Sequence, residues 1–318
     1  MIQNIISNEY FEYSKEFLIS GSKFCGIRSI SSNNLFDIFK TDLIDEVQNK
    51  SAEVKYYSIN GFDHYFIIKK LGWDTEFFQR PIYKILATLY KHEDYNILRK
   101  AIKTFKDEFL QESEKNAYCF LELPSEANIL LQSLTCNGFR LVESRLHHYL
   151  KGIQTFNYKR FLVRDADVND LRNLSKMSSN TRNKYDRFHS DIYFADDLAD
   201  KYLGKFAQET VNGFADKVIV PNEPGIEPNA LFAVNLLKSD WSKVGANVSQ
   251  LVLAAVDPNT CRGWYEKLLS EICYYLKENG AEYLITNTQT TNKAPIHVNE
   301  KLGFKYSHTT HILTISNV

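Results

Sequence analysis

The spacing of apolar residues over the first 150 positions predicts strands that alternate with helices. The clearest helix is expected at Glu93–Glu114, where Ile97, Ile102, Phe105 and Phe109 recur at three-to-five-residue spacing. The expected order is strands around Tyr56–Tyr57, Tyr65–Lys69 and Pro81–Tyr90, helix Glu93–Glu114, strand Ala117–Leu123, helix Ser125–Cys136 and strand Phe139–Leu150.

A polar interruption at Gly152–Tyr158 predicts a boundary between domains 1–152 and 153–318. Both halves contain a helix followed by Gly-Phe and a strand, which indicates either an internal repeat or ordinary helix punctuation. After the boundary we expect strand Arg160–Asp165, a helix capped by Asp167, a polar stretch at Asn180–Asp191, helix Ala195–Asn212, strands Lys217–Val220, Ala230–Leu237 and Gln250–Val256, helix Gly263–Asn279, strand Glu282–Asn287, helix Asn292–Leu302 and strand Phe304–Ile315.

Composition narrows the class of protein. The chain has 318 residues, with 38 Lys plus Arg against 39 Asp plus Glu, so a large footprint for nucleic acid or anionic lipid is not expected. The N-terminus lacks a signal peptide's apolar region, and we expect a cytoplasmic protein with no membrane contact. The five cysteines have no CxxC spacing, so neither a metal site nor a disulfide framework is expected.

The most informative segment is Leu251–Leu269, where an apolar strand ending at Val256 runs through a short polar loop into an amphipathic helix. The helix begins after Arg262-Gly263. A helix start of this kind directs several unpaired backbone N–H groups at one point, where the helix dipole also favours negative charge. A pyrophosphate would fit there. An ordinary strand-to-helix turn is the alternative.

This segment resembles the pyrophosphate-binding motif of GNAT acyltransferases, with Arg262-Gly263 as its core and Trp264 and Tyr265 at positions where the family has further glycines. A second segment, with Asn292 and Glu300–Phe304, resembles the closing motif of the same superfamily. The resemblance implies an α/β GNAT fold: a mixed, mostly antiparallel sheet flanked by helices, preceded here by a GNAT-like N-terminal domain.

The resemblance also implies an acyl-CoA donor, either acetyl-CoA or another short acyl-CoA such as a hydroxyacyl-CoA. In the family, the strand before Asn292 splays away from the strand ending at Val256, and the V between them takes the pantetheine arm. The residues implied at the cofactor are Val256, Thr260, Cys261, Arg262, Gly263, Trp264, Tyr265 and Asn292.

Three further segments, "LGWDTEFF", "GFRLVE" and "RFHSD", resemble dTDP-fucosamine N-acetyltransferases and related nucleotide-amino-sugar N-acyltransferases of surface-polysaccharide pathways. They imply a dTDP-linked amino sugar as the acceptor, and a homodimer would be ordinary. Asp74 and Glu76 in the first segment are expected to be exposed strand or turn carboxylates, or to shape a cleft.

Glu143 shares strand parity with Phe139 and Leu141, so it faces the interior if that face is buried. A buried carboxylate there could accept a proton from the sugar ammonium or hold that ammonium in place. His189 is the competing general base, with Asp191 two residues on to orient it, although a surface histidine is an equally ordinary interpretation.

Three more residues are candidates around the acceptor and the leaving group. Arg187 would suit the diphosphate of a nucleotide sugar or form a helix-terminal salt bridge, and Phe188 or Tyr185 could stack on a base or sugar. Asn299 stands where the family often has a Tyr that protonates the departing thiolate, and an amide can only hydrogen-bond it.

No nucleophile elbow is visible, so we expect an amine to attack the thioester directly. Two other functions stay open. One is a tandem-GNAT aminoacyl transferase, against which the near-zero net charge counts. The other is a non-catalytic acyl-CoA-binding regulator, to which Asn299 in place of Tyr gives some support.

Overall fold

The computed structural model describes residues 6–112 and 116–316, and in it the chain divides into two units. Unit 1 holds residues 6–25, Ser31–Ser144 and 308–316 of the described chain, and unit 2 holds Gly26–Ile30 and Arg145–Ser307. The chain therefore changes unit within β5 (Arg140–Lys151) and again within β11 (Lys305–Ser316). Within β5 the change of unit falls at Ser144–Arg145. The domain boundary expected at residue 152 stays a prediction.

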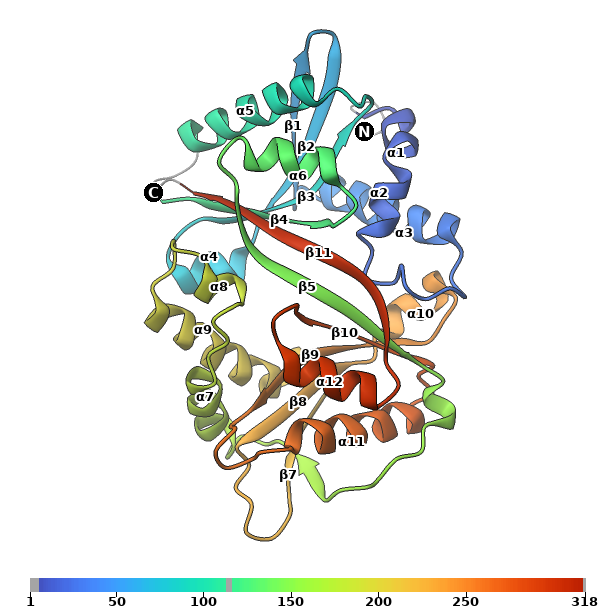
Figure 1. The fold of residues 1–318 in the computed structure, drawn as a ribbon, viewed down its shortest axis with the longest axis vertical. Helices are drawn as coiled ribbons and strands as arrows, with labels where there is room; N and C mark the ends of the chain where they lie inside the picture. The colour runs from blue at the N-terminus through green and yellow to red at the C-terminus, as the bar shows by residue number, and fades with distance from the viewer. Residues whose placement is uncertain (1–5, 113–115, 317–318) are drawn as a thin grey trace. The chain divides into compact units, whose positions relative to one another are not determined.

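Unit 1 is built on the strand order β1-β2-β3-β4-β11, in which only β3 and β4 are parallel (Figure 1). Its elements in chain order are α1 (Asn8–Tyr13), α2 (Lys15–Ser20), α3 (Ser32–Gln48), β1 (Glu53–Ile59), β2 (Phe62–Lys70), α4 (Gly72–Phe78), β3 (Ile82–Tyr90), α5 (Tyr95–Glu112), β4 (Tyr118–Pro124) and α6 (Asn128–Thr135).

Strand β2 of unit 1 is buried on both faces because helices cover each side. Phe66 and Ile68 of β2 pack with α5 and α6, whereas Tyr65 and Ile67 of the same strand pack with α1, α2 and α3. Successive residues of a strand point to opposite faces, so a run of apolar residues is expected in a strand buried on both sides.

Unit 2 has the strand order β5-β10-β9-β8-β7-β6, in which only β9 and β10 are parallel. Its elements are β6 (Val163–Asp165), α7 (Leu171–Asn180), α8 (Arg187–Ser190), α9 (Asp196–Glu209), a short π-helix (Thr210–Phe214), β7 (Lys217–Pro221), β8 (Ala230–Asn235), α10 (Lys238–Val244), β9 (Val248–Val256), α11 (Trp264–Glu278), β10 (Tyr283–Gln289) and α12 (Lys293–Lys301), with a 3-10 turn at Ile153–Thr155.

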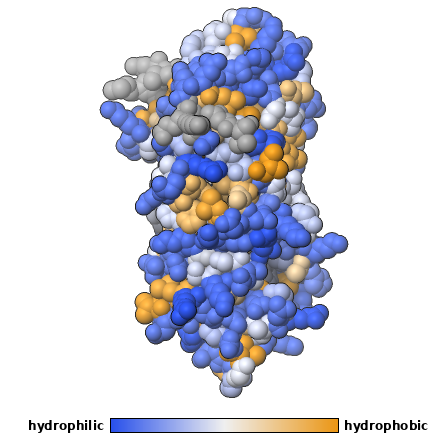
Figure 2. Space-filling model, turned by 90° about the vertical axis from the view of Figure 1, so that its left-hand side faces the viewer, coloured by the Kyte–Doolittle hydropathy of each residue, from blue (hydrophilic) through white to orange (hydrophobic). Residues whose placement is uncertain are grey.

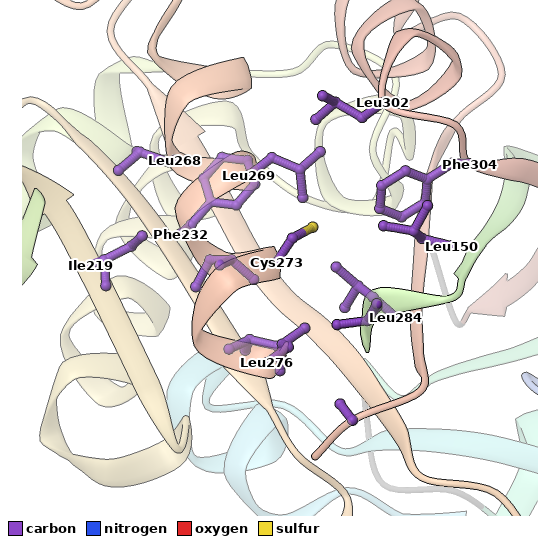
Figure 3. Packing of buried hydrophobic residues seen from close by; sticks show 14 of the residues in the cluster. Leu150, Ile219, Phe232, Leu268, Leu269, Cys273, Leu276, Leu284, Leu302 and Phe304 are labelled. Atoms are coloured by element: carbon purple, nitrogen blue, oxygen red, sulfur yellow. The ribbon is translucent and has the colours of Figure 1, made fainter. Parts of the chain in front are cut away.

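Two apolar clusters hold the sheet of unit 2 between its helices. Leu268, Leu276 and neighbouring side chains of α11 pack on Phe232 of β8 and on Leu284 of β10 (Figure 3). On the other face, Leu174 and Met177 of α7 pack on alternate residues of β7 and β8. The expected mixed, mostly antiparallel sheet flanked by helices is therefore confirmed.

Some expected elements differ from those in the structure. The sequence patterns do not predict helices α1 to α4, α8 and α10. Asp74 is a buried residue of α4, so its interpretation as an exposed carboxylate is wrong, and a part in shaping a cleft stays a prediction. Helix α7 begins at Leu171 rather than after Asp167, whose carboxylate instead accepts the N–H of Asn169. The last residues of the helix expected at Glu93–Glu114 lie outside the described chain.

The face shown in Figure 2 is mostly hydrophilic, with apolar side chains in small, separate groups. Single exposed apolar residues such as Ile192 and Val168 are ordinary on protein surfaces. Within residues 6–112 and 116–316, no helix combines the length and the apolar character that crossing a bilayer requires.

Unit 1 contains a buried pair of histidines. His92 Nδ1 accepts the N–H of Asp94 at 3.1 Å, so its proton must be on Nε2, which lies 2.7 Å from His64 Nε2. His64 in turn donates from Nδ1 to the carbonyl of Tyr57 at 3.4 Å. Burial, with the neighbouring His92, lowers the pKa of His64 to about 4, and burial lowers the pKa of His92 as well. This hydrogen-bonded chain needs both rings neutral.

We expect this pair to make the protein unstable in mild acid. The pKa of His64 is below the value of about 6.5 in the unfolded chain, so its contribution is complete above pH 6.5 and is lost as the pH falls toward 4. Urea unfolding between pH 4 and 7.5 should show a loss of up to about 3 kcal/mol from this group. His64→Gln should flatten that dependence. An unchanged slope in the variant would contradict the assignment.

Candidate functional site

Strands β9 and β10 lie side by side at one end only. They pair in parallel through Tyr283 with Val248, Leu284 with Ser249 and Ile285 with Gln250, and their recorded pairing stops there. Beyond this point β9 continues to Val256 and β10 to Gln289. The V-shaped opening that the resemblance implied is therefore present, and its apex lies at Gln250 and Ile285.

A bulge in β9 next to the apex accompanies the separation of the strands. Ala233 of β8 pairs with Leu253 and Val234 pairs with Leu251, so Val252 is an extra residue on β9. A bulge bends its strand and increases the local twist. The bulge therefore gives a physical reason why β9 stays paired with β8 but leaves β10.

The loop after β9 delivers the chain to α11 through a glycine with a left-handed backbone. Gly263 has φ of +84°, it stands at the N-cap position of α11, and no side chain caps the helix there. A Cβ at Gly263 would meet no atom within 4 Å, so the space in front of this helix end is open. The first N–H groups of a helix have no partner within the helix; here the N–H of Trp264 donates to the carbonyl of Cys261, and open space lies beside Gly263.

Two side chains of the segment that leads into α11, Cys261 and Trp264, are buried in the protein interior. The thiol of Cys261 is buried, lies 3.4 Å from the carbonyl oxygen of Glu227, and has a pKa raised by burial. Trp264 is buried in the core, and the N–H groups of Cys261 and Trp264 both donate within the loop. Cofactor contacts expected from Cys261 and Trp264 are therefore contradicted. Tyr265 packs edge-on against Phe232.

Helix α12 supplies the two amides expected from the closing motif. Asn292 precedes its first turn and donates from Nδ2 to Thr288 Oγ1 at 3.1 Å. Asn299 is 1% exposed, and neither its Oδ1 nor its Nδ2 has a hydrogen-bond partner among the described residues. Leaving a buried hydrogen-bonding group unpaired costs about 1–3 kcal/mol of folding stability, which suggests that a bound molecule supplies the missing hydrogen-bond partners of Asn299.

A cavity of about 630 Å³ opens beside the end of β9. Its lining includes Lys176 of α7, Arg182, Glu227 and Asp257, together with the side chains of four asparagines. The cavity is polar, and it presents both signs of charge.

A hydrogen-bonded chain joins this cavity to the loop before α11. Asn173 donates to Asn229 at 2.7 Å, Asn229 donates to Thr260 at 3.2 Å, and Thr260 donates to Asp257 at 2.9 Å. The backbone N–H of Asn259 lowers the pKa of Asp257, as do the side chains of Thr260 and Asn259, so this carboxylate stays charged. Thr260, expected at the cofactor, is thus part of the hydrogen-bonded chain that connects this loop to α7 through Asn229.

His189 is held on both sides by carboxylates. Its Nδ1 lies 2.8 Å from Asp186 and its Nε2 lies 3.0 Å from Asp200, and its side chain is 1% exposed. Burial disfavours the charged ring, but the hydrogen bonds and charges of the two carboxylates outweigh burial and raise the pKa of His189. A buried imidazole with both nitrogens engaged is not suited to be a general base. The expected orienting role of Asp191 is also wrong, because Asp186 and Asp200 fill it.

The other residues expected at the acceptor lie in and around α8. Phe188 is buried against Phe194 and Tyr202, with ring centroids 5.1 and 4.3 Å away, so it cannot stack on a nucleotide base. Arg187 is buried with its guanidinium 4.3 Å from the ring centroid of Phe188, whereas Tyr185 is exposed. Only Tyr185 has the exposure that a stacking contact with a ligand needs.

Glu143 belongs to unit 1, not to the unit that holds the split strands and α11. It is 3% exposed, so it meets the condition of burial on which its expected role depends. Leu141, two residues earlier, is 51% exposed, and the expected common face of Phe139, Leu141 and Glu143 is therefore not uniformly buried. The role of Glu143 at an acceptor stays a prediction.

Comparison with solved structures identifies the fold. The chain aligns with a GCN5-related N-acetyltransferase from Sphaerobacter thermophilus over 86% of this chain and 85% of that one, with a TM-score of 0.54 and 11% identity. It also aligns over 98% of its length with 37% of a fungal multi-domain GH3 β-N-acetylglucosaminidase, described as containing a GCN5-related glucosamine N-acetyltransferase region, with a TM-score of 0.58 and 8% identity.

A third similar structure is a tandem GNAT protein from the clavulanic acid biosynthesis pathway, with a TM-score of 0.49, 12% identity, and coverage of 98% of this chain and 96% of that one. No protein-family model and no curated protein match the sequence. The chain has the GNAT fold. At this level of identity, the comparisons establish the fold alone.

The position of His189 gives a testable consequence for stability. Because its folded pKa is above the unfolded value, the contribution of the charged ring is complete below about pH 6.5 and is lost as the pH rises through the folded pKa. His189→Gln should therefore cost on the order of 2 kcal/mol at pH 6 and less at pH 9. Urea unfolding at the two pH values measures this difference.

His297→Gln is the matched control, because His297 is exposed on α12 of the same unit. It should change the free energy of unfolding little at either pH. A cost of His189→Gln that is equal at pH 6 and pH 9 would show that the ring is not charged in the folded protein.

Proposed function

We propose that this protein is an acyl-CoA-dependent N-acyltransferase. The observation that carries the proposal is the combination of split strands and an open helix start. An extended chain can bind along β9 where β10 has left it, and a diphosphate can accept from the uncapped N–H groups of α11. In an acyl-CoA, the pantetheine arm would bind along β9 and the diphosphate would bind at the start of α11.

The proposed reaction is direct transfer. The amine nitrogen bonds to the thioester carbonyl carbon, the C–S bond breaks, and an amide and the free CoA thiol are formed. Backbone N–H groups of β9 would stabilise the negative charge on the carbonyl oxygen. Cys261 is buried with a raised pKa, which supports direct attack over a covalent acyl-enzyme.

Asn299 is the residue proposed to meet the leaving sulfur. Its amide is buried and unpaired among the described residues, so a ligand atom there would satisfy a group that otherwise costs stability. An amide can donate a hydrogen bond to a thiolate, but it cannot transfer a proton to it near neutral pH. The proton must come from another group.

We propose a dTDP-linked amino sugar, used in surface-polysaccharide synthesis, as the acceptor. The polar cavity beside Val256 supports this choice because its volume suits a molecule of that size. Amide side chains can pair with sugar hydroxyls, Asp257 or Glu227 can hold an ammonium group, and Lys176 or Arg182 can approach a diphosphate. Arg187 and Tyr185 stay secondary candidates for contacts with this acceptor.

The proposed diphosphate contact predicts that Gly263 is essential for donor binding. Gly263→Val should raise the KM for acyl-CoA at least tenfold, equivalent to about 1.4 kcal/mol, because the new side chain occupies the open space in front of α11. Steady-state kinetics with varied acetyl-CoA, or calorimetric titration with CoA, measures the change.

Gly280→Val is the matched control, because Gly280 also has a positive φ of +77° with open space, but it follows the other end of α11. Both variants should lose similar stability through backbone strain. Only Gly263→Val should weaken CoA binding. Equal CoA affinity in the two variants would remove the basis of the proposal. Tight CoA binding without turnover on any amino sugar would favour the non-catalytic regulator.

The proposed acceptor site predicts a role for the charge of Lys176. Lys176→Met should raise the KM for a dTDP-amino sugar about tenfold or more, with little change in the KM for acetyl-CoA, because a charged hydrogen bond contributes about 1.5–3 kcal/mol. Lys201→Met is the control, because the Lys201 side chain is exposed on α9; it should change neither the KM for the dTDP-amino sugar nor the KM for acetyl-CoA. If the two variants behave alike, the cavity does not bind the acceptor's anionic group.

A further inference from the structure

A buried polar layer lies under α12, and the proposed chemistry has so far used only one of its members. His148 of β5 is 4% exposed, and its Nδ1 has no hydrogen-bond partner within the part of the chain that the structure describes. Thr286 of β10 is 5% exposed. Asn299 of α12 is 1% exposed, and neither Oδ1 nor Nδ2 of its amide has a hydrogen-bond partner among the described residues. Unpaired buried groups are rare in folded proteins and call for a specific explanation.

The strand register places this layer at the apex of the V. His148 pairs with Thr286, and Thr286 is the first residue of β10 beyond Ile285, where the pairing with β9 ends. Leu150 pairs with Leu284 one step earlier on the same face, and both belong to the core under α11. His148 and Thr286 therefore lie at the level where the separation of β9 and β10 begins.

Helix α12 closes this layer from above. A Cβ at Gly303, just after the helix, would lie 3.9 Å from Leu150, which fixes the level of the helix end on β5. Asn299 precedes Gly303 by one helical turn, about 5 Å of rise. His148 precedes Leu150 by two strand residues, about 7 Å. The helix runs back along the strands, so Asn299 and His148 are at similar heights.

The surroundings of His148 keep its ring neutral. Burial lowers its pKa, the negative charge of Glu300 on α12 raises it, and His147, the next residue on β5, lowers it, with a net lowering. Since successive strand residues point to opposite faces, His147 lies on the other side of the sheet. A neutral imidazole with an unpaired nitrogen can accept a proton at neutral pH.

We propose that His148 carries the proton of the transfer reaction, taking it from the attacking amine and giving it to the departing sulfur. This role rests on the proposed function. As the N–C bond forms, one N–H proton moves to the imidazole, and as the C–S bond breaks, the same proton moves to the thiolate, so the ring ends neutral. Asn299 donates a hydrogen bond to the sulfur but moves no proton.

The proposed proton path includes a bridging water. The arm of an acyl-CoA would take the place of a strand beside β10, about 5 Å from it on the side away from β5. The thioester, at the end of the arm, lies deepest and therefore nearest the apex. His148 pairs with Thr286, the residue at the edge of this space, and one bridging water would complete the proposed path to the thioester.

The first test measures the imidazole itself. Nitrogen-15 NMR of histidine side chains, between pH 5 and 8, should show His148 neutral at pH 7, with its signal assigned by its loss in His148→Gln. A non-hydrolysable thioether analogue of acetyl-CoA should shift that signal, whereas the signal of exposed His297 should stay unchanged. If the analogue perturbs the N–H of residues at the start of α11 but not His148, the proton-carrier role is wrong and the CoA site stands. If nothing shifts, both proposals fail.

The second test is kinetic and uses a matched pair of neighbours. His148→Gln should lower kcat by roughly 10²–10⁴ with a dTDP-amino sugar and acetyl-CoA, with little change in the KM for acetyl-CoA. The acidic limb of kcat/KM, expected below pH 6.5, should disappear. His147→Gln should keep that limb, because this ring is on the opposite face. An acidic limb that persists in His148→Gln, or disappears in His147→Gln, would overturn the proposal.

Discussion

The separation of β9 from β10 is the constraint on which the candidate site depends. Two parallel strands that pair over three residues and then part leave backbone groups of both strands without their usual partners. The bulge at Val252 bends β9, and apolar packing by α11 on one face and α7 on the other holds the divided sheet. The fold keeps this costly gap open because packing elsewhere supports it.

Polar groups around the gap fall into two kinds. Thr260, Asn229 and Asp257 are satisfied among themselves, and they fix the loop that leads into α11. His148 and Asn299 are buried yet unpaired within the described chain. The first kind is held by hydrogen bonds within the protein, although Asn229 and Asp257 also line the cavity. The second kind suggests chemistry, because a group that costs stability in the free protein is one that a ligand can satisfy.

Histidines show how the same side chain takes different roles through its neighbours. In the His64–His92 pair of unit 1, burial outweighs the charges of Asp63 and Asp94, so both rings have lowered pKa values. His189 is also buried, but two carboxylates raise its pKa and occupy both nitrogens. At His148, burial and the neighbouring His147 outweigh the charge of Glu300, so its pKa is lowered, and its Nδ1 has no partner within the described residues. Burial alone does not decide whether a histidine can act as a base.

The order of most strands and helices, and the two segments proposed to bind the donor, could be predicted from the sequence, because they depend on local patterns: apolar periodicity, a glycine at a helix start and a short motif. The strand ending at Val256, the helix after Gly263 and the amides at Asn292 and Asn299 could be located from such patterns alone.

Which polar side chains are satisfied depends on the tertiary structure, because their partners lie far away in the chain. His189 is held by Asp200, and Phe188 by Tyr202, on a neighbouring helix, so neither is available as the sequence suggested. His148 had no sequence signal, since its pairing with Thr286 joins positions 138 residues apart (286 − 148), and only the register of β5 on β10 brings it to the apex of the V.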